Sequence, residues 1–498
     1  MSSPVDIPFS EFIKIDRRKQ DPVYLQIVYQ FIQAIQRRLL DDGVRIPGSR
    51  PLSHELGIHR KTMVAALDEL EAQGWVEIRP NIGTFVRNIE AKKRNGEQKP
   101  VGRSRFTGTS DFSFRENFVL DLPHQEHHCK YYFTDGRPDY RIIKTDELAQ
   151  FYSAALRRKS VISRLSEYSM EGNLFFREQL SYYLNLTRGF HISQKNLLNT
   201  KNKAILLHIL SQLLIREGDR IAVGDFSDFL PNMIFNQAGA VLTTIPVDQN
   251  GIDVNFLRRN YGKGDIKFVL TSAQHQYPKT TNLSAERRKQ LIALAEEYDF
   301  IIIEDDENHE LTYERSAALP LVKIDSSERV IYLGSFGSFL IPGFQTTFLV
   351  APEDFIREAR KYLNVFGQID VIKEQALADM IRTGDIHRYR RKALKAYHTR
   401  RDAFAELLLR HLADYITFDP PAGGLAFWVR FRRPINLVRL SEILKENGLF
   451  LPRTCLFQNR NTCALRLGFG HLNEKEMKET VTLLKSGCEI LFRSSAGD

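Results

Sequence analysis

The sequence places three side chains suited to contact with a polyanion at consecutive positions, at the predicted start of a helix. Arg60, Lys61 and Thr62 follow a glycine break and precede an apolar repeat. Cationic and hydroxyl groups in the first turn of a helix donate to phosphates and base edges, while the apolar stripe packs inward. These residues indicate contact with nucleic acid, although surface charge is the simpler explanation for any one of them alone.

Other residues extend this set. Arg50 starts the preceding predicted helix, from which it reaches a phosphate, and the turn at Asn81 and Gly83 allows the backbone to approach the minor groove. The full set expected to bind DNA lies in one segment: Arg50, His59, Arg60, Lys61, Thr62, Asn81 and Gly83.

A second set of polar residues follows buried strands predicted in the long C-terminal part. It comprises Asp225, His275 to Lys279, Asp305 to Glu307, and Gly334 to Ser338. Because a parallel sheet places ligands at the carboxyl ends of its strands, we expect a ligand site there. The sequence has no evident metal-ligand set, nucleophile-base constellation or nucleotide loop, and the spacing of its four cysteines predicts reduced thiols in a cytosolic protein.

The elements that position the first set are helical. Apolar residues at three- and four-residue steps predict an amphipathic helix over 22–40, ended by Gly43. A short helix capped by Ser49 is predicted to reach Gly57, and a longer one spans 59–73. The alternating segments WVEIR and GTFVR then predict a hairpin around a turn at 80–83. Three helices followed by a hairpin predict a winged helix-turn-helix.

The elements that position the second set alternate between strands and helices from about residue 112 onward. This pattern predicts an α/β class with a mostly parallel sheet. The buried-strand candidates lie at 221–225, 241–247, 267–272, 300–305, 329–334 and 347–352. An amphipathic helix, AERRKQLIALAEEY, lies between two of them.

The length of the chain predicts more than one domain, and its charge is more basic in the N-terminal part. A chain of 498 residues with 43% apolar and 26% charged residues folds into about three domains or subdomains. Residues 1–105 hold 18 Lys and Arg against 13 Asp and Glu, within a net charge of +9. The polar, basic stretch 88–111 is predicted to be a flexible linker. Without a signal sequence or an apolar run of membrane length, we expect a soluble intracellular protein.

Residues 22–87 resemble the winged helix-turn-helix of GntR-type bacterial regulators, through PVYLQI, RIPGSRPLSHELGIHRKT and GTFV. The resemblance implies operator contacts by Arg50, Arg60, Thr62 and Gly83. In two departures, His59 stands where the family usually has a Ser or Thr cap, and Asn81 stands where the wing often has Gly.

The rest of the chain resembles fold-type I aminotransferases, and in particular the MocR-type regulators, in which such a domain follows a GntR winged helix. The motifs, in family order, are FTDGRPD, TSAQHQYP, IIIEDDENHE, RVIYLGSFGSFLIPGF, AGGLAFW and ALRLGFG. The resemblance implies a DNA-binding domain at 12–87, a linker at 88–111 and an aminotransferase-like domain at 112–498. The latter would have a large subdomain at about 150–360 and a smaller α+β subdomain at about 370–495. It also implies a head-to-tail homodimer.

The family cofactor is pyridoxal phosphate (PLP), and the resemblance allows its site to be checked position by position. Asp305 matches the carboxylate that holds the pyridinium nitrogen, but Ser338 stands where the family has its Schiff-base lysine. Serine cannot form an imine. Four further positions differ from the family: Gln345 replaces a phosphate-binding Arg, Asn202 and Lys203 replace the phosphate cup, Glu307 replaces a Tyr, and Asp228 falls at the ring-stacking position. We expect no covalently bound cofactor.

Other residues near these motifs have two interpretations each. Lys201, Lys203 and Lys279 either restore positive charge to the site or are ordinary exposed lysines. Arg466 matches the arginine that holds a substrate carboxylate, and an acid-binding pocket or a structural salt bridge fits it equally. His275 and Tyr277 either face a ligand or only pack.

These observations favour a bacterial transcription regulator located in the cytoplasm with the nucleoid. The winged helix would bind double-stranded operator DNA, and an inactive aminotransferase-like domain would dimerise and sense a small carboxylate or amino-acid-like effector. The alternatives are an active PLP aminotransferase with a DNA-binding appendage, and a regulator whose large domain is only a dimerisation scaffold.

Overall fold

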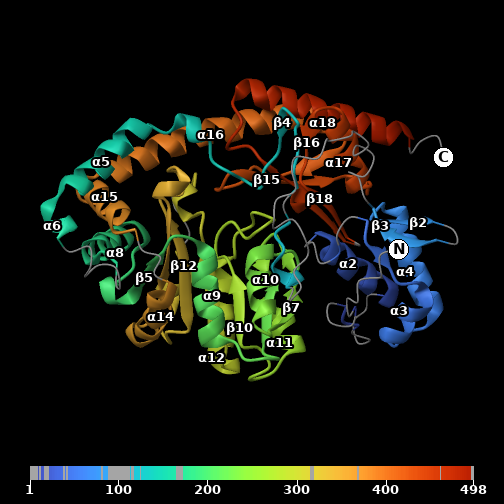
Figure 1. Cartoon of the computed structure of the whole chain (residues 1–498), viewed down its shortest axis with the longest axis horizontal. Helices are drawn as coiled ribbons and strands as arrows, with labels where there is room; N and C mark the ends of the chain where they lie inside the picture. Colours follow the sequence, from blue (N-terminus) through green and yellow to red (C-terminus); the bar gives the residue numbers. More distant parts are fainter. Residues whose placement is uncertain are drawn as a thin grey trace. The chain divides into compact units, whose positions relative to one another are not determined.

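The computed structural model describes residues 9, 13–15, 22–36, 40, 43–79, 82–87, 113, 117–123, 125–163, 172–314, 319–366, 370–459 and 461–494. The chain divides into two compact units, whose elements are labelled in Figure 1. Unit 1 comprises Met1–Tyr132, Phe431–Ala464 and Thr482–Asp498. Unit 2 comprises Phe133–Arg430 and Leu465–Val481.

The N-terminal part of unit 1 is a small helical domain with a three-stranded sheet. Its elements are α2 (Val23–Gln36), β1 (Arg45–Ile46), α3 (Ser49–Glu55), α4 (Arg60–Ala72), β2 (Val76–Arg79) and β3 (Gly83–Val86). The strand order is β1-β3-β2, with both pairs antiparallel. Ile27 and Phe31 of α2 and Leu70 of α4 are fully buried, so the two helices share one apolar core. The predicted three helices and wing are confirmed.

Two details of the sequence prediction are wrong in this domain. The residue at the N-cap of α3 is Gly48, with no side-chain hydrogen bond, and Ser49 is the first helical residue. The third helical residue is Pro51, which has no N–H, so one of the donors that a cap would satisfy is missing. The described part of α2 is Val23–Gln36, and Leu40 is not helical. The predicted linker at 88–111 lies outside the described residues.

The later segments of unit 1 form short elements. They are η2 (Phe118–Leu120), β4 (Tyr131–Tyr132), α17 (Leu437–Glu446), β16 (Leu449–Phe450), η7 (Arg453–Cys455) and β17 (Leu456–Asn459). Strand β16 pairs in parallel with β4. Strand β18 (Thr462–Gly468) and helix α18 (Glu474–Ser494) continue from one unit into the other along the chain.

Unit 2 is built on a seven-stranded sheet that is mostly parallel. In spatial order its strands are β5 (Leu197–Thr200), β13 (Thr346–Val350), β12 (Val330–Phe336), β11 (Ile301–Asp306), β10 (Phe268–Thr271), β6 (Arg220–Gly224) and β7 (Val241–Ile245). Only β13 runs antiparallel to its neighbours. All six buried-strand candidates are strands of this sheet, which confirms the α/β class.

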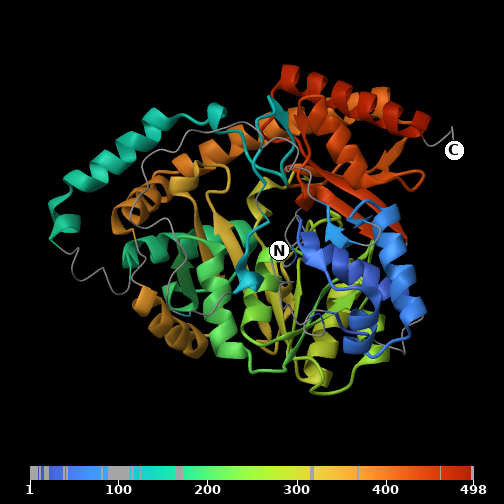
Figure 2. The same ribbon diagram turned by 45° about the vertical axis from the view of Figure 1, so that its right-hand side comes forward.

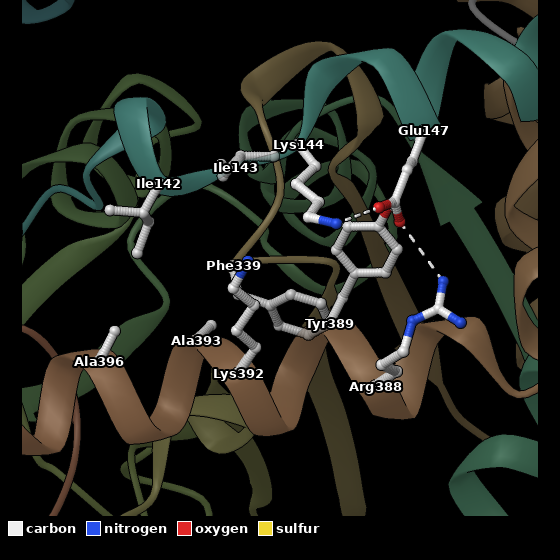
Figure 3. A pocket seen from close by; sticks show the side chains of 10 residues that line it. All are labelled: Ile142, Ile143, Lys144, Glu147, Phe339, Arg388, Tyr389, Lys392, Ala393 and Ala396. Carbon is white, nitrogen blue, oxygen red and sulfur yellow. Dashed lines mark hydrogen bonds and ion pairs between the residues drawn. The ribbon is translucent and has the colours of Figure 1, made fainter.

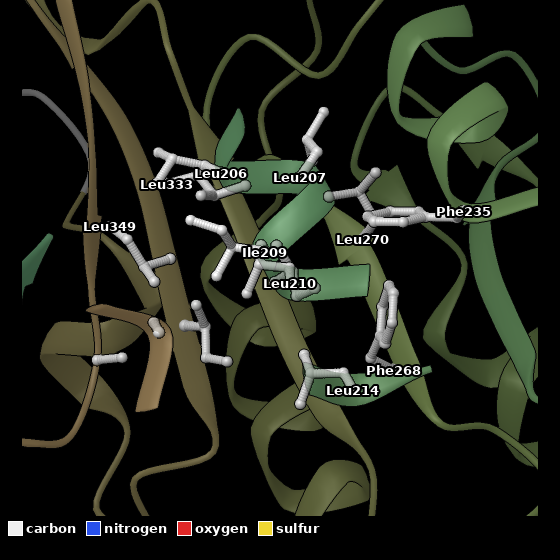
Figure 4. Packing of buried hydrophobic residues seen from close by; sticks show 14 of the residues in the cluster. Leu206, Leu207, Ile209, Leu210, Leu214, Phe235, Phe268, Leu270, Leu333 and Leu349 are labelled. Atoms are coloured by element: carbon white, nitrogen blue, oxygen red, sulfur yellow. The ribbon is translucent and has the colours of Figure 1, made fainter. Parts of the chain in front are cut away.

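Helices cover both faces of the sheet. One face packs against α9 (Lys203–Leu214), α10 (Phe229–Gln237) and α14 (Glu353–Phe366). Figure 4 shows the leucines and isoleucine of α9 directed at side chains of β10, β12 and β13. The other face packs against α11 (Val254–Asn260), α12 (Ala285–Tyr298) and α13 (Leu321–Ile324). The strands are thus apolar on both sides, as a buried parallel sheet requires.

The remaining elements of unit 2 flank the sheet. They are β8 (Val247–Asp248), β9 (Gly251–Ile252), α5 (Thr145–Arg157), α6 (Lys159–Ile162), α8 (Leu174–Arg188), α15 (Val371–Arg382), α16 (Asp385–Leu412), β14 (Ile416–Phe418) and β15 (Ala426–Phe431), with 3-10 turns η3 (Tyr140–Ile142), η4 (Gln194–Asn196), η5 (His309–Leu311) and η6 (Pro342–Phe344). Helix α15 packs against α5 and α8, and both views show α5 running along α15 (Figures 1 and 2).

We predict that Gly334→Ala destabilises the protein, because a Cβ at this buried position of β12 would collide with the ring of Phe348 on β13. Overpacking of this kind costs about 1–3 kcal/mol. The midpoint of thermal unfolding should therefore fall. In the control Gly343→Ala, a Cβ would meet nothing within 4 Å, and the midpoint should stay unchanged. Equal midpoints for the two variants would contradict the packing of β12 on β13.

Candidate functional site

The first turn of α4 presents polar side chains to solvent and apolar side chains to the core. Arg60 and Lys61 are exposed and Thr62 is half-buried. The buried face of the same helix carries Met63, Ala66, Leu67 and Leu70. The two cations are therefore accessible to a large polyanion, in the arrangement that the sequence predicted.

A histidine begins this helix. The Nδ1 atom of His59 accepts the backbone N–H of Lys61 at 3.2 Å, so an imidazole nitrogen takes the capping role usual for a Ser or Thr oxygen. The Nε atom of Arg60 lies 3.5 Å from Ser49 Oγ, which links the first turns of α3 and α4. Arg50 is exposed on α3 beside them.

The wing depends on a glycine for a reason that the sequence did not reveal. Gly83 has a φ of 143°, and a Cβ there would lie 2.8 Å from Nε of Arg45. The guanidinium of Arg45 therefore packs over the wing backbone, where any side chain at residue 83 would displace it. Asn81, which was predicted to contact DNA, lies outside the described residues.

The second set of residues gathers at the carboxyl edge of the large sheet. Asp228, Tyr277 and Asp305 line one cavity of about 30 Å³, which also borders the end of β6 and the start of α10. A cavity of this size holds a water molecule or two and is far below the roughly 300–1,000 Å³ of typical small-molecule sites.

The side chain of Lys203, the first residue of α9, contacts two residues that line this cavity. Its Nζ lies 2.6 Å from Oδ2 of Asp305, 3.2 Å from Oε2 of Glu307 and 3.5 Å from Oδ2 of Asp228. The side chain is 12% exposed. Burial lowers the pKa of Lys203, but the three carboxylates outweigh it and raise that pKa well above its usual value. The amine is therefore a protonated ammonium held among carboxylates.

The helix start that would form a phosphate cup is also satisfied internally. Asn202 is the N-cap of α9, and its Oδ1 accepts the backbone N–H of Ile205 at 3.1 Å. A donor that would face an anion at this helix end is therefore already used.

The three lysines near the motifs behave differently. Lys279 Nζ contacts both carboxylate oxygens of Asp225, at 3.0 and 3.1 Å, and donates to the carbonyl oxygen of Val247 at 2.6 Å. Lys201 is exposed. The side chains of Lys203 and Lys279 are only 12% and 13% exposed, because both ammonium groups pair with adjacent carboxylates. The interpretation as ordinary exposed lysines is thus wrong for these two residues.

Arg466 on β18 forms a salt bridge. Its Nε lies 2.5 Å from Oδ1 of Asp135, and its Nη1 donates to the carbonyl oxygen of Pro278 at 2.7 Å. The guanidinium lies 4.9 Å from the ring centroid of Tyr277. Burial raises the pKa of Asp135 to about 6, while Arg466 and the Tyr277 hydroxyl lower it, so the pair is ionised at neutral pH. Arg466 thus binds a carboxylate of this chain, Asp135, whereas the resemblance assigns it to the carboxylate of a substrate.

Ser338 is held by a buried carboxylate. Its backbone N–H and its hydroxyl donate to Oε2 of Glu310, at 2.9 and 3.1 Å, and Tyr183 donates to the other oxygen at 3.2 Å. Glu310 is fully buried, and burial raises its pKa. The Nε2 of Gln345 donates to the carbonyl oxygen of Leu340 at 2.8 Å. The side chains of Ser338 and Gln345 thus form hydrogen bonds that hold the loop between β12 and β13.

His275 packs rather than facing a cavity. It is 7% exposed, its Nε2 lies 3.3 Å from Thr312 Oγ1, and a Cβ at Gly423 would collide with its ring. Burial lowers the pKa of His275 to about 4, so the ring is neutral near pH 7.

Sequence reasoning missed two carboxylates of this region. Asp135 and Glu310 lie inside the motifs FTDGRPD and IIIEDDENHE, so their positions were visible but their partners were not. Over the part of the chain that the structure describes, no group of three or more potential ligands is placed to hold a metal ion. Within those same residues, no helix is long and apolar enough to span a membrane.

Comparison with known proteins identifies two parts of the chain. Residues 23–86 match the family model for bacterial regulatory proteins of the gntR family. The chain thus carries a GntR-type helix-turn-helix DNA-binding domain, followed by an aminotransferase-like α/β fold. The fold is shared with the multiple substrate aminotransferase from Thermococcus profundus, at 22% identity and a TM-score of 0.64, over 73% of this chain and 92% of that one.

Relatives that combine both parts align over nearly the whole chain. An uncharacterized HTH-type transcriptional regulator, YdeL of Bacillus subtilis, is 23% identical over 96% of this chain and 99% of its own. The probable rhizopine catabolism regulatory protein MocR of Rhizobium meliloti is 24% identical over 97% of both chains. The chain is therefore similar, from end to end, to proteins named as transcriptional regulators.

We predict that Lys203→Met destabilises the protein at neutral pH by about 3 kcal/mol, because it leaves three carboxylates around an uncharged side chain. A lysine with a raised pKa contributes stability below its unfolded value near 10, and this contribution is lost as pH rises through the higher folded value. The deficit should thus persist from about pH 6 to 9, and shrink in acid as the carboxylates become protonated. Denaturant titrations at several pH values would measure it.

The matched control is Lys201→Met, two residues away on an exposed side chain. It removes the same charge without touching the carboxylates, so its stability should equal that of the wild type. If both variants lost the same stability, the effect would come from overall charge and not from the cluster.

Proposed function

We propose that this protein is a sequence-specific DNA-binding transcription regulator of the bacterial cytoplasm, located with the nucleoid, whose aminotransferase-like domain has no catalytic activity. The main support is the first turn of α4, capped by His59, which exposes Arg60 and Lys61 beside Arg50 in a segment matching the gntR family. The domain limits for this assignment are 12–87 for DNA binding and 112–498 for the aminotransferase-like part.

In this proposal α4 enters the major groove. Its N-terminal residues, with Thr62, contact base edges, while Arg50 and the wing at Gly83 and Asn81 contact the backbone and minor groove. The protein acts as a homodimer, with the aminotransferase-like domains paired head to tail. A two-fold dimer matches two operator half-sites, so operator symmetry would reflect protein symmetry.

The proposed lack of catalysis rests on two contacts and one cavity. The position expected to carry the Schiff-base amine is Ser338, whose hydroxyl donates to Glu310. The carboxylate expected to bind a pyridinium nitrogen, Asp305, instead contacts the ammonium of Lys203 at 2.6 Å. The cavity that Asp305 lines measures about 30 Å³. PLP does not fit residues arranged in this way, and no chemical step is assigned to it.

The former cofactor region would then serve regulation. The residues assigned to it lie at the sheet edge or face it: Asn202, Lys203, Asp225, His275, Tyr277, Asp305, Glu307, Ser338, Gln345 and Arg466. A small carboxylate or amino-acid-like effector would compete for groups that the protein now pairs internally. A coupling of about 1–3 kcal/mol between this region and the DNA-binding geometry suffices for control.

We expect Arg60→Ala to weaken binding to the operator by about 1–3 kcal/mol, because it removes a charge-assisted contact at the start of α4. Fluorescence anisotropy with labelled operator duplex at fixed salt would measure this loss. Arg258→Ala, which removes an exposed arginine on α11 of unit 2, is the control and should bind normally. Normal binding by the Arg60 variant would mean that another element reads the DNA.

We expect incubation with PLP to produce no imine absorption band and no stoichiometric pyridoxyl adduct after borohydride reduction. Lys203 is held as an ammonium among carboxylates and Lys279 is ion-paired with Asp225, and an ammonium does not condense with an aldehyde. Absorption spectra and peptide mass spectrometry provide the measurement. An unrelated protein of similar lysine content sets the level of surface labelling, and one adduct per chain on a single lysine would support the active aminotransferase instead.

A further inference from the structure

Unit 2 has a second cavity, away from the one beside Asp305. It measures about 140 Å³ and lies between the start of α5 and the middle of α16, as Figure 3 shows. It is lined by Ile142, Ile143, Lys144, Glu147, Phe339, Arg388, Tyr389, Lys392, Ala393 and Ala396. It is more than four times as large as the space left at the former cofactor region.

One wall of this cavity is apolar. Ile142 and Ile143 come from the turn before α5, Phe339 comes from the loop after β12, and Ala393 and Ala396 lie one turn apart on α16. The two small residues on α16 leave the space that larger side chains would fill. A short aliphatic group would find contact on three sides here, with the hydrophobic gain of burial.

The rim of the cavity carries an excess of positive charge. Glu147 is shared by Lys144, at 2.6 Å, and Arg388, at 3.3 Å, and it also accepts from the Tyr389 hydroxyl at 2.6 Å. Figure 3 draws Lys392 at the same mouth, on the turn of α16 that follows Tyr389. Among the residues that the structure describes, Lys392 contacts no carboxylate, so this ammonium is available to an anion.

We propose that this cavity binds a small carboxylate with a short, branched apolar chain. The carboxylate would contact Lys392 at the rim, and the chain would lie against Phe339 and Ala393. The volume lies below the roughly 300–1,000 Å³ of sites for drug-sized ligands, which limits the occupant to a few carbon atoms beyond its carboxylate. The two methyl groups of a branched chain would lie against different lining residues, one on Phe339 and one on Ala393.

This site would differ from the former cofactor region but would contact the same framework. Phe339 directly follows Ser338, whose N–H and hydroxyl donate to Glu310. On the other side, Arg390 of α16 donates from Nε to the carbonyl oxygen of Glu310 at 3.0 Å. Two of the elements that line the cavity therefore converge on one buried residue. Binding at this site does not depend on whether the protein is a DNA-binding regulator.

The test uses the full-length protein without DNA, with 3-methylbutanoate as the probe and 3-methylbutanamide as its neutral isostere. We expect saturable binding of the acid by isothermal titration or ligand-observed NMR, with the amide binding about tenfold more weakly because it lacks the charge. Lys392→Gln should weaken binding of the acid about two- to fivefold, the size of an exposed ion pair. Ala393→Leu should weaken it by about tenfold or more, because the larger side chain fills the cavity.

Lys395→Gln is the matched control, since it removes an exposed lysine of the same helix that does not line the cavity, and binding should be unchanged. Circular dichroism and melting curves of the Ala393 variant separate a filled cavity from a lost fold, and the exposed Lys392 variant tests the site without that risk. No binding of the acid, equal binding of acid and amide, or equal effects of the two lysine variants would each overturn the proposal. Operator binding is measured separately, so its failure would leave this result unaffected.

Discussion

The carboxyl edge of the large sheet depends on one ionic contact, that between Lys203 and Asp305. Asp305, Glu307 and Asp228 bring three carboxylates within 3.5 Å of a single amine, and without that amine their mutual repulsion would open the edge. The lysine begins α9, and its reach to the end of β11 joins a covering helix to the sheet on which it packs. Lys203 thus offsets part of the negative charge of this cluster from within the chain.

The same principle recurs at two neighbouring places. Asp135 neutralises Arg466, and Glu310 accepts both donors of Ser338. Buried polar groups without partners cost about 1–3 kcal/mol each, so internal pairing stabilises this region. In this aminotransferase-like fold, charged groups at the carboxyl edge of the sheet thus find partners within the chain. A ligand that binds here must interact with these groups more strongly than the internal partner that it displaces.

The sequence predicted elements better than contacts. Six strands were identified because each segment is short and rich in Val, Ile, Leu or Phe, and the winged helix because its apolar periods are short and separated by glycines. The prediction of Ser49 as a helix cap was wrong because Pro51 has no N–H to donate a hydrogen bond to a capping side chain. The burial of Lys203 and Lys279 was missed because composition does not show which carboxylates the fold will place beside an amine. Asp135 and Arg466 are more than 300 residues apart, and only the fold joins them.

The imidazole at the start of α4 also fixes where one proton must reside. Because Nδ1 of His59 accepts the Lys61 N–H, the neutral ring carries its hydrogen on Nε2, which turns an N–H away from the helix. The leading edge of that helix is then lined by donors alone, from imidazole, guanidinium and ammonium.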